Sequence, residues 1–188
     1  EWLGTMANTF LHFGLFFEDV LGGVACVGRS PGKEVGTRFG LKQTDVLLLA
    51  RGTCAHWTPP GGASRLIAWT TRFLAEEGTA RIVVAYCDPE AGEIGTVYQA
   101  CGWRYLGLGQ PQHVGAVSPE GKVVHNRTIC GMISRANGAG DKVRNAFRRA
   151  GWNVRRDSRK HVYATALDPT IAPRLERDAQ PYPKREAE

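Results

Sequence analysis

Two side chains suited to proton transfer, Asp88 and Tyr98, stand between apolar segments of the chain. Asp88 follows the apolar residues 80–87 and precedes Pro89, which favours an extended or turn conformation. At such a position an aspartate either caps the turn or accepts a proton from an attacking amine. Tyr98 either packs in the core or protonates a departing thiolate or alkoxide. If both take part in chemistry, their oxygens must face each other across one solvent-lined gap.

A glycine-containing turn, residues 58–67 (TPPGGASRLI), joins an apolar segment to an amphipathic one. Glycines let a ligand approach the backbone closely, and the first N–H groups of a helix have no partner within that helix. An anion is therefore expected here, either a coenzyme pyrophosphate or a nucleic-acid phosphate. The alternative is that Ser64 caps the helix and Pro60 forms a simple turn. The candidate donor-binding residues are Gly61, Gly62, Ala63, Ser64 and Arg65.

Positive charge is concentrated in residues 142–161 (KVRNAFRRAGWNVRRDSRKH), which hold eight Lys or Arg and a single acid. This segment carries a net charge of +7 in a chain of net +6, so the other residues carry about −1. Six of its cations are arginines, which bind phosphate in a bidentate manner, and Phe147 and Trp152 are interleaved with them. The segment is either a solvated helix face or a nucleic-acid surface, and the arginine excess favours the second. The candidate contacts are Arg148, Arg149, Arg155, Arg156 and Lys160.

The five cysteines are scattered and include no C-x-x-C pair. We expect reduced, buried thiols, which indicates a cytoplasmic protein. Cys54 and His56 stand two residues apart, a spacing that metal sites accept, but no second pair matches it. His56 either hydrogen-bonds beside Trp57 or joins distant histidines around a metal. We assign no metal ligands, and a metal requirement stays open.

The composition is that of an ordinary globular protein, with 188 residues, of which 43% are hydrophobic and 22% charged. No apolar run reaches the roughly 18 residues that a membrane-spanning helix needs, so no membrane partner is expected. The first residues lack the basic and apolar regions of a signal peptide, and none is expected.

Hydrophobic periodicity predicts the α/β (α+β) class, a mixed sheet with helices on its faces. We expect one domain over residues 1–167 and a polar, proline-bearing tail over residues 168–188. Residues 29–43 are expected to form a loop. The expected strands are 10–19, 20–28, 44–54, 80–87, 103–109, a hairpin at 115–129 that turns at 118–121, and 160–167; the expected helices are 63–78, 95–102 and 140–151.

The same segments resemble the Mom family of bacteriophage DNA-modification proteins, which is related to the GNAT acyltransferase fold. The most specific block is AYCDPEAGEIGTVYQACGW, residues 85–103. The resemblance covers nearly the whole chain, through HFGLFFEDVLGGVACVG, VLLLARGTC, PPGGASRLI, GKVVHNRTI, RKHVYATALD and YPKR. In two places the chain departs from the family: Glu1-Trp2 replaces a His-Tyr pair, and Gly61-Gly62 replaces an asparagine.

The resemblance implies a GNAT-like splayed mixed, mostly antiparallel sheet that holds an acyl-type donor at the glycine-containing turn. It implies an enzyme that adds a glycinamide-derived (carbamoylmethyl) group to the exocyclic amine of adenine in phage DNA. That modification would shield the phage DNA from restriction in the bacterial host cytoplasm. By position, Asp88, Tyr98 and Ser64 become the candidate catalytic residues. The implied donor is acetyl-CoA or another acyl donor, glycyl-tRNA included.

Double-stranded DNA is then the expected partner, with the target adenine flipped out because base pairing engages its amine. Trp57, Trp103 or Trp2 would stack on the base, and Arg51 would add a DNA contact. Two other functions remain open. One is a GNAT-type N-acetyltransferase acting on a protein or a small amine, which would turn over without DNA. The other is a basic binding module without catalysis, which would tolerate Asp88→Asn.

Overall fold

The computed structural model describes residues 8–30, 34–111, 115–135, 140–155 and 159–184. Contacts divide the chain into two compact units, Glu1–Leu108 with His161–Glu188, and Gly109–Lys160. The sequence predicted one domain through residue 167. Within that range the chain leaves the main sheet after β5 (Arg104–Leu108) and returns to it at β9 (His161–Ala166), and the residues between them form the second unit.

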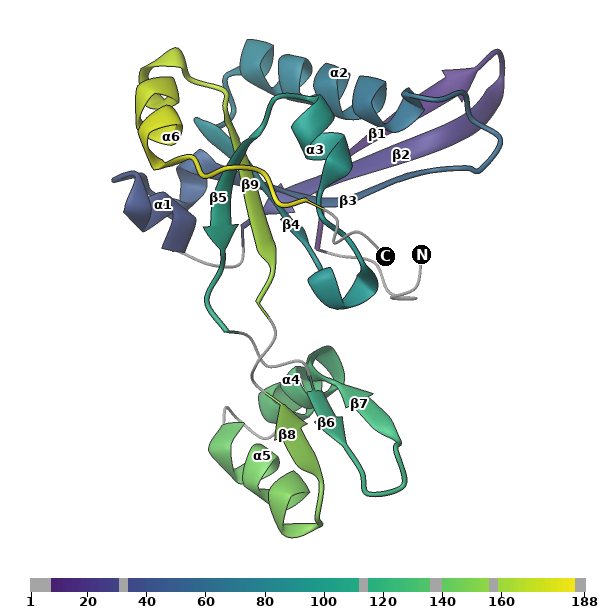
Figure 1. Ribbon diagram of the computed structural model, residues 1–188, viewed down its shortest axis with the longest axis vertical. Coiled ribbons are helices and arrows are strands. Elements are labelled where there is room, and N and C mark those ends of the chain that lie inside the picture. Colours follow the sequence, from purple (N-terminus) through teal and green to yellow (C-terminus); the bar gives the residue numbers. More distant parts are fainter. Residues whose placement is uncertain (1–7, 31–33, 112–114, 136–139, 156–158, 185–188) are drawn as a thin grey trace. The chain divides into compact units, whose positions relative to one another are not determined.

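The first unit contains a six-stranded sheet in the order β1-β2-β3-β4-β9-β5 (Figure 1). The predicted hairpin is confirmed as β1 (Leu11–Phe17) and β2 (Val20–Arg29), which are joined at Glu18 and Asp19. All neighbouring strands in this sheet are antiparallel except β3 (Val46–Cys54) and β4 (Ile82–Cys87), which run parallel. The sheet is therefore mixed and mostly antiparallel.

The parallel strands β3 and β4 separate after a short paired stretch. Residues 46–48 pair with residues 82–84, and no further pairing joins the two strands. Beyond that stretch β3 continues to Cys54 beside β2, and β4 continues to Cys87 beside β9. The sheet thus opens between their C-terminal halves. The predicted fold class, a splayed mixed sheet flanked by helices, is confirmed.

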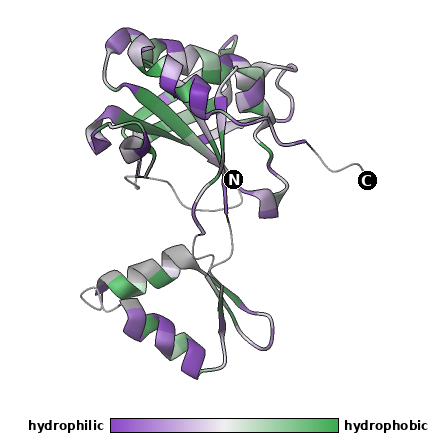
Figure 2. Cartoon of the chain, turned by 60° about the vertical axis from the view of Figure 1, so that its left-hand side comes forward, coloured by the Kyte–Doolittle hydropathy of each residue, from purple (hydrophilic) through white to green (hydrophobic). Residues whose placement is uncertain are grey.

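Both faces of the main sheet are buried, as the side chains of β4 show. Val83 and Ala85 belong to the core that includes residues of α2 (Gly62–Glu77). Ile82 and Val84 belong to a second core, which includes residues of α1 (Glu34–Arg38) and α6 (Ala172–Asp178). Successive strand residues point to opposite faces, so an unbroken apolar run is what such a strand requires. Figure 2 shows these strands as predominantly hydrophobic.

Three helices arose where the sequence predicted other structure. The expected loop 29–43 contains α1 and the 3-10 turn η1 (Gln43–Asp45), and it buries Val35, Phe39 and Leu41. The expected tail 168–188 contains η3 (Pro169–Ile171) and α6, which bury Ile171 and Leu175. In each case two or three apolar residues within a polar stretch join the same core cluster as side chains of the sheet. The third helix, α4 (Asn126–Arg135), belongs to the second unit.

Leu175→Ala tests whether residues 171–178 are part of the folded core. Because Leu175 is 2% exposed, the change is expected to lower the free energy of unfolding by about 2–5 kcal/mol. The measurement is denaturant unfolding at equilibrium. The control is Arg177→Ala, an exposed position on the same helix, with an expected change within about 0.5 kcal/mol. Equal, small changes in both variants would show that α6 is peripheral.

The second unit is built on a three-stranded antiparallel sheet in the order β7-β6-β8. Strands β6 (Gly115–Val117) and β7 (Val123–His125) form the predicted hairpin, and the Gly121 N–H donates to the Ser118 carbonyl at its turn. After β7 the chain forms α4 rather than a longer strand. The predicted helix α5 (Gly140–Arg149) follows, and β8 (Asn153–Arg155) completes the sheet.

Candidate functional site

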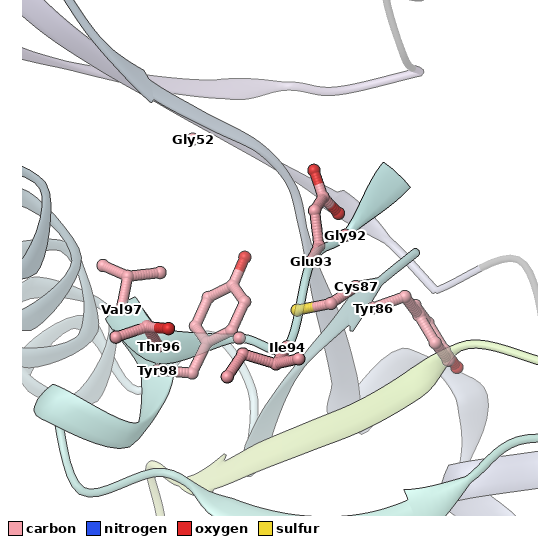
Figure 3. A pocket seen from close by; sticks show the side chains of 10 residues that line it. Gly52, Tyr86, Cys87, Gly92, Glu93, Ile94, Thr96, Val97 and Tyr98 are labelled. Carbon is pink, nitrogen blue, oxygen red and sulfur yellow. The ribbon is translucent and has the colours of Figure 1, made fainter. Parts of the chain in front are cut away.

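A pocket of about 280 Å³ lies where β3 and β4 diverge (Figure 3). One wall comes from Gly52 of β3 and the other from the end of β4 and the segment that follows it. Figure 3 shows that the Tyr98 hydroxyl, the Glu93 carboxylate and the Cys87 sulfur point into this space. The residues that line the pocket are Gly52, Tyr86, Cys87, Gly92, Glu93, Ile94, Gly95, Thr96, Val97 and Tyr98.

Tyr98 is held by aromatic packing with its hydroxyl directed into the pocket. Its ring centroid lies 5.1 Å from that of Trp103 and 5.4 Å from that of Tyr163. Burial raises the pKa of the Tyr98 phenol, and the nearby Cys87 and Glu93 raise it further. The phenol therefore stays protonated well above its ordinary pKa of about 10, which suits a proton donor.

Tyr98 lies on the short helix α3 (Thr96–Ala100), which Tyr163 holds in place through hydrogen bonds. The Tyr163 hydroxyl donates to the Ile94 carbonyl at 2.5 Å and accepts from Gln99 Nε2 at 3.0 Å. Gly95 begins the helix with φ +75°, and a Cβ there would lie 2.3 Å from the Tyr163 ring. Only glycine fits this position, so the Gly95-Tyr163 contact fixes where Tyr98 enters the pocket.

Asp88 has a local structural role in the described geometry. Its Oδ1 accepts from the Glu90 N–H at 3.0 Å, which caps the 3-10 turn η2 (Pro89–Ala91). Asp88 is not among the residues that line the pocket, whereas Glu93 is. The structure thus brings Tyr98 to the pocket together with Glu93, not with Asp88.

The start of α2 exposes backbone, but its serine is engaged locally. Gly61 is the N-cap, with φ +83°, and the Ser64 hydroxyl donates to the Gly61 carbonyl at 2.9 Å. Ser64 therefore neither caps the helix nor lines the pocket described above. Gly61 is exposed, whereas Gly62 is buried: a Cβ there would lie 3.5 Å from Thr58 Oγ1 and 3.6 Å from Leu15 Cδ2. Ala63 is half-buried and Arg65 is exposed.

The aromatic candidates for base stacking differ in exposure. Trp57 is 46% exposed and makes an edge contact with Phe17, at 5.8 Å between ring centroids. Trp103 is 2% exposed and packs behind Tyr98, which excludes it from stacking on a base. Trp2 lies outside the described residues. Arg51 is half-buried on β3, where its Nη1 donates to the Ala50 carbonyl at 2.7 Å.

The basic segment forms one face of α5 in the second unit. Lys142, Arg148 and Arg149 are exposed, while Val143 and Phe147 are half-buried. Phe147 packs edge-on against Trp152, and Figure 2 shows hydrophilic residues along this helix. Arg148 Nη1 donates to Asn145 Oδ1 at 2.8 Å, and Lys160 is half-buried at the end of the unit. The side chain of Arg155 and the whole of Arg156 lie outside what the structure describes.

The cysteines and histidines form no recognisable metal site in the described part of the chain. No three His, Cys, Asp or Glu side chains gather there in an arrangement that could hold an ion. His56 is exposed, and burial raises the pKa of the Cys54 thiol. Among the same residues, no helix has the length and apolar character needed to cross a bilayer.

Of the residues that line the pocket, the sequence interpretation named only Tyr98 as a site residue, and Gly52, Cys87 and Glu93 are among those it missed. Gly52 interrupts an otherwise side-chain-bearing strand, which is a signal of close approach by another group. Glu93 follows Gly92, which has φ +71°, so the chain reverses there and turns the carboxylate towards the strand end. Cys87 was interpreted only as a buried thiol.

Fold and pocket together define an α/β protein whose splayed sheet holds a tyrosine and a carboxylate at the divergence of two parallel strands. The chain belongs to the Mom protein family, whose sequence model matches residues 3–184. The family resemblance predicted from the sequence is thus confirmed. A search of the curated proteins found no significant match.

Among solved structures, the chain is similar to several N-acetyltransferases. One, from Staphylococcus aureus Mu50, is 13% identical over 84% of this chain and 67% of its own, with a TM-score of 0.43. The putative acetyltransferase yncA from Salmonella typhimurium, solved with its cofactor acetyl-CoA, is 10% identical over 84% and 64%, with a TM-score of 0.47. A ribosomal-protein-alanine N-acetyltransferase from Brucella melitensis is 11% identical over 82% and 67%, with a TM-score of 0.43. The chain spans about two thirds of the length of these proteins.

Proposed function

We propose that this protein is a DNA-modifying transferase that adds a glycinamide- or acyl-derived group to the exocyclic amine of adenine. In phage DNA within the host cytoplasm, the modification protects against restriction. The observation that carries the proposal is that residues 3–184 match the Mom family. This is the family whose resemblance implied the activity in the sequence analysis. The pocket at the opened sheet, with Tyr98 directed into it, supports a transfer reaction there.

The reaction depends more on the positioning of the amine and the donor than on the strength of a catalytic base. Pairing and aromatic delocalisation make the adenine amine a poor nucleophile, so the base leaves the duplex and enters the pocket. Holding amine and donor carbonyl in contact supplies most of the acceleration. Tyr98, kept neutral by its buried surroundings, donates its proton to the leaving thiolate or alkoxide.

The acyl donor is acetyl-CoA or another acyl donor such as glycyl-tRNA, both of which carry phosphate. The α2 start fits such a group because Gly61 is exposed and α2 is 16 residues long. The backbone N–H groups of Ala63 and Ser64, with the exposed side chain of Arg65, would hold the phosphate. The donor supplies an acyl group that is already activated, as a thioester or an ester, for attack by the amine.

Nucleosides from plasmid DNA co-expressed with the protein test this proposal by mass spectrometry. A modified deoxyadenosine is expected with the wild-type protein. Glycyl and carbamoylmethyl groups contain the same atoms and add one mass, while an acetyl group adds a different one, so the mass also reports the donor class. Unmodified DNA in hosts that supply every candidate donor, with acetylation of proteins or small amines instead, would overturn it.

The basic face of α5 is proposed to hold DNA phosphates. Replacing Arg148 and Arg149 with alanine is expected to weaken DNA binding. The slope of log affinity against log salt concentration should also become shallower, by the amount that about two phosphate contacts contribute. Fluorescence anisotropy across a salt series measures both quantities. The matched control replaces Arg72 and Arg177, two exposed arginines of the other unit. An equal change in slope for both pairs would mean that net charge alone, and not this helix face, sets the affinity.

A further inference from the structure

We propose that Glu93, rather than Asp88, is the carboxylate that takes the proton from the attacking amine. The inference rests on the proposed function and names the base of that same site. It assigns a catalytic role to a residue that the family resemblance and the spacing of the sequence motif left out.

The position of Glu93 is fixed by the turn it closes. The backbone N–H of Asp88 donates to Glu93 Oε2 at 2.9 Å, so the end of β4 holds one carboxylate oxygen. Gly92 reverses the chain immediately before it, with φ +71°. Among the described residues that line the pocket, Glu93 is the only acid. Figure 3 shows its carboxylate directed to the same space as the Tyr98 hydroxyl.

Asp88 and Glu93 therefore have different roles in the turn. Asp88 directs its side chain to the Glu90 N–H and its backbone N–H to Glu93. It shapes the loop, and in doing so it orients the carboxylate that faces the pocket. Burial raises the pKa of Tyr98, and the nearby charge of Glu93 raises it further.

The transfer step balances with these two groups alone. With an acetyl or glycyl donor, the adenine N6 attacks the donor carbonyl and forms the C–N bond of an N6-acyl adenine, while the bond from the carbonyl carbon to the departing sulfur or oxygen breaks. The N6 proton passes to Glu93, and the Tyr98 proton passes to the leaving group. Solvent then returns the proton from Glu93 to Tyr98, and the net change is one proton moved from amine to leaving group.

Glu93→Gln tests the assignment in the full-length protein, since an amide oxygen can still accept from the Asp88 N–H. Single-turnover transfer should fall by about 10²–10⁴-fold with unchanged DNA affinity. The control is Glu90→Gln, an exposed acid of the same turn, for which the wild-type rate is expected.

The outcomes separate two kinds of failure. Wild-type protein that leaves DNA unmodified overturns the proposed function itself. Wild-type protein that modifies adenine, with Glu93→Gln at the same rate, overturns only the assignment of Glu93. A large loss in Asp88→Asn without one in Glu93→Gln would make Asp88 the base instead. The folded state of each variant is checked by thermal unfolding.

Discussion

Tyr98→Phe is expected to lower the rate of group transfer by about 10²–10⁴-fold while DNA affinity stays near that of the wild type. Phenylalanine keeps the ring contacts with Trp103 and Tyr163, whose centroids lie 5.1 and 5.4 Å away. What is removed is the hydroxyl that points into the pocket. Single-turnover kinetics with saturating DNA and donor measures the loss without interference from binding.

A matched control removes the hydroxyl of another tyrosine, one that makes a structural hydrogen bond. Tyr182 donates to the Trp103 carbonyl at 2.8 Å, so Tyr182→Phe should lower stability without changing the rate per folded molecule. Equal loss of transfer and of DNA affinity in Tyr98→Phe would make the tyrosine structural. An equal loss of rate in both variants would point to a shared effect on the aromatic cluster.

The pKa of Tyr98 also sets the sign of a pH effect. Because burial raises this pKa, the folded protein favours the neutral phenol, and the unfolded chain ionises first. The stability gained from the neutral form is therefore complete below pH of about 10 and is lost as the pH rises above it. Over the same range the donor proton is retained, so ionisation of Tyr98 does not limit transfer under physiological conditions.

The strands of the main sheet were predictable because their signal is local. β4 is an unbroken apolar run, and a strand that is buried on both faces requires one. Helices α1 and α6 were not predictable in this way, since the polar stretches that contain them bury only Val35, Phe39 and Leu41 in one case and Ile171 and Leu175 in the other. Their burial depends on a sheet face that distant strands create, and no short window of sequence contains that information.

At the candidate site the sequence analysis singled out Asp88 in the turn after β4, whereas the carboxylate that lines the pocket is that of Glu93. Both Asp88 and Glu93 follow β4 within six residues, and Asp88 has the motif position. Which carboxylate faces the pocket depends on the reversal at Gly92 and on the hydrogen bond from the Asp88 N–H to Glu93. Likewise, Trp103 was a candidate for stacking until the contact with Tyr98 placed it in the core.

Gly52→Leu is expected to abolish transfer while leaving the fold intact. Gly52 is the β3 residue that lines the pocket, and its Cβ would meet only Ile67 Cδ1, at 3.9 Å, an ordinary contact. Its φ is not positive, so any side chain is tolerated by the backbone. A leucine would therefore occupy part of the 280 Å³ where amine and donor must meet. Because a displacement of about 1 Å can cost 10²-fold in rate, we expect at least that loss.

The thermal stability of Gly52→Leu should not fall with its transfer rate, which distinguishes a blocked pocket from a folding defect. Glycine weakens a strand interior, so Gly52→Leu is expected to keep or slightly raise the midpoint of thermal unfolding. Gly52→Ala should give an intermediate rate, since it adds one methyl group to the pocket wall. The control is Thr53→Leu, the next residue of β3, which is exposed and does not line this pocket. Wild-type transfer in Gly52→Leu would show that the reacting groups meet elsewhere, and the opened sheet would then serve only the architecture of the fold.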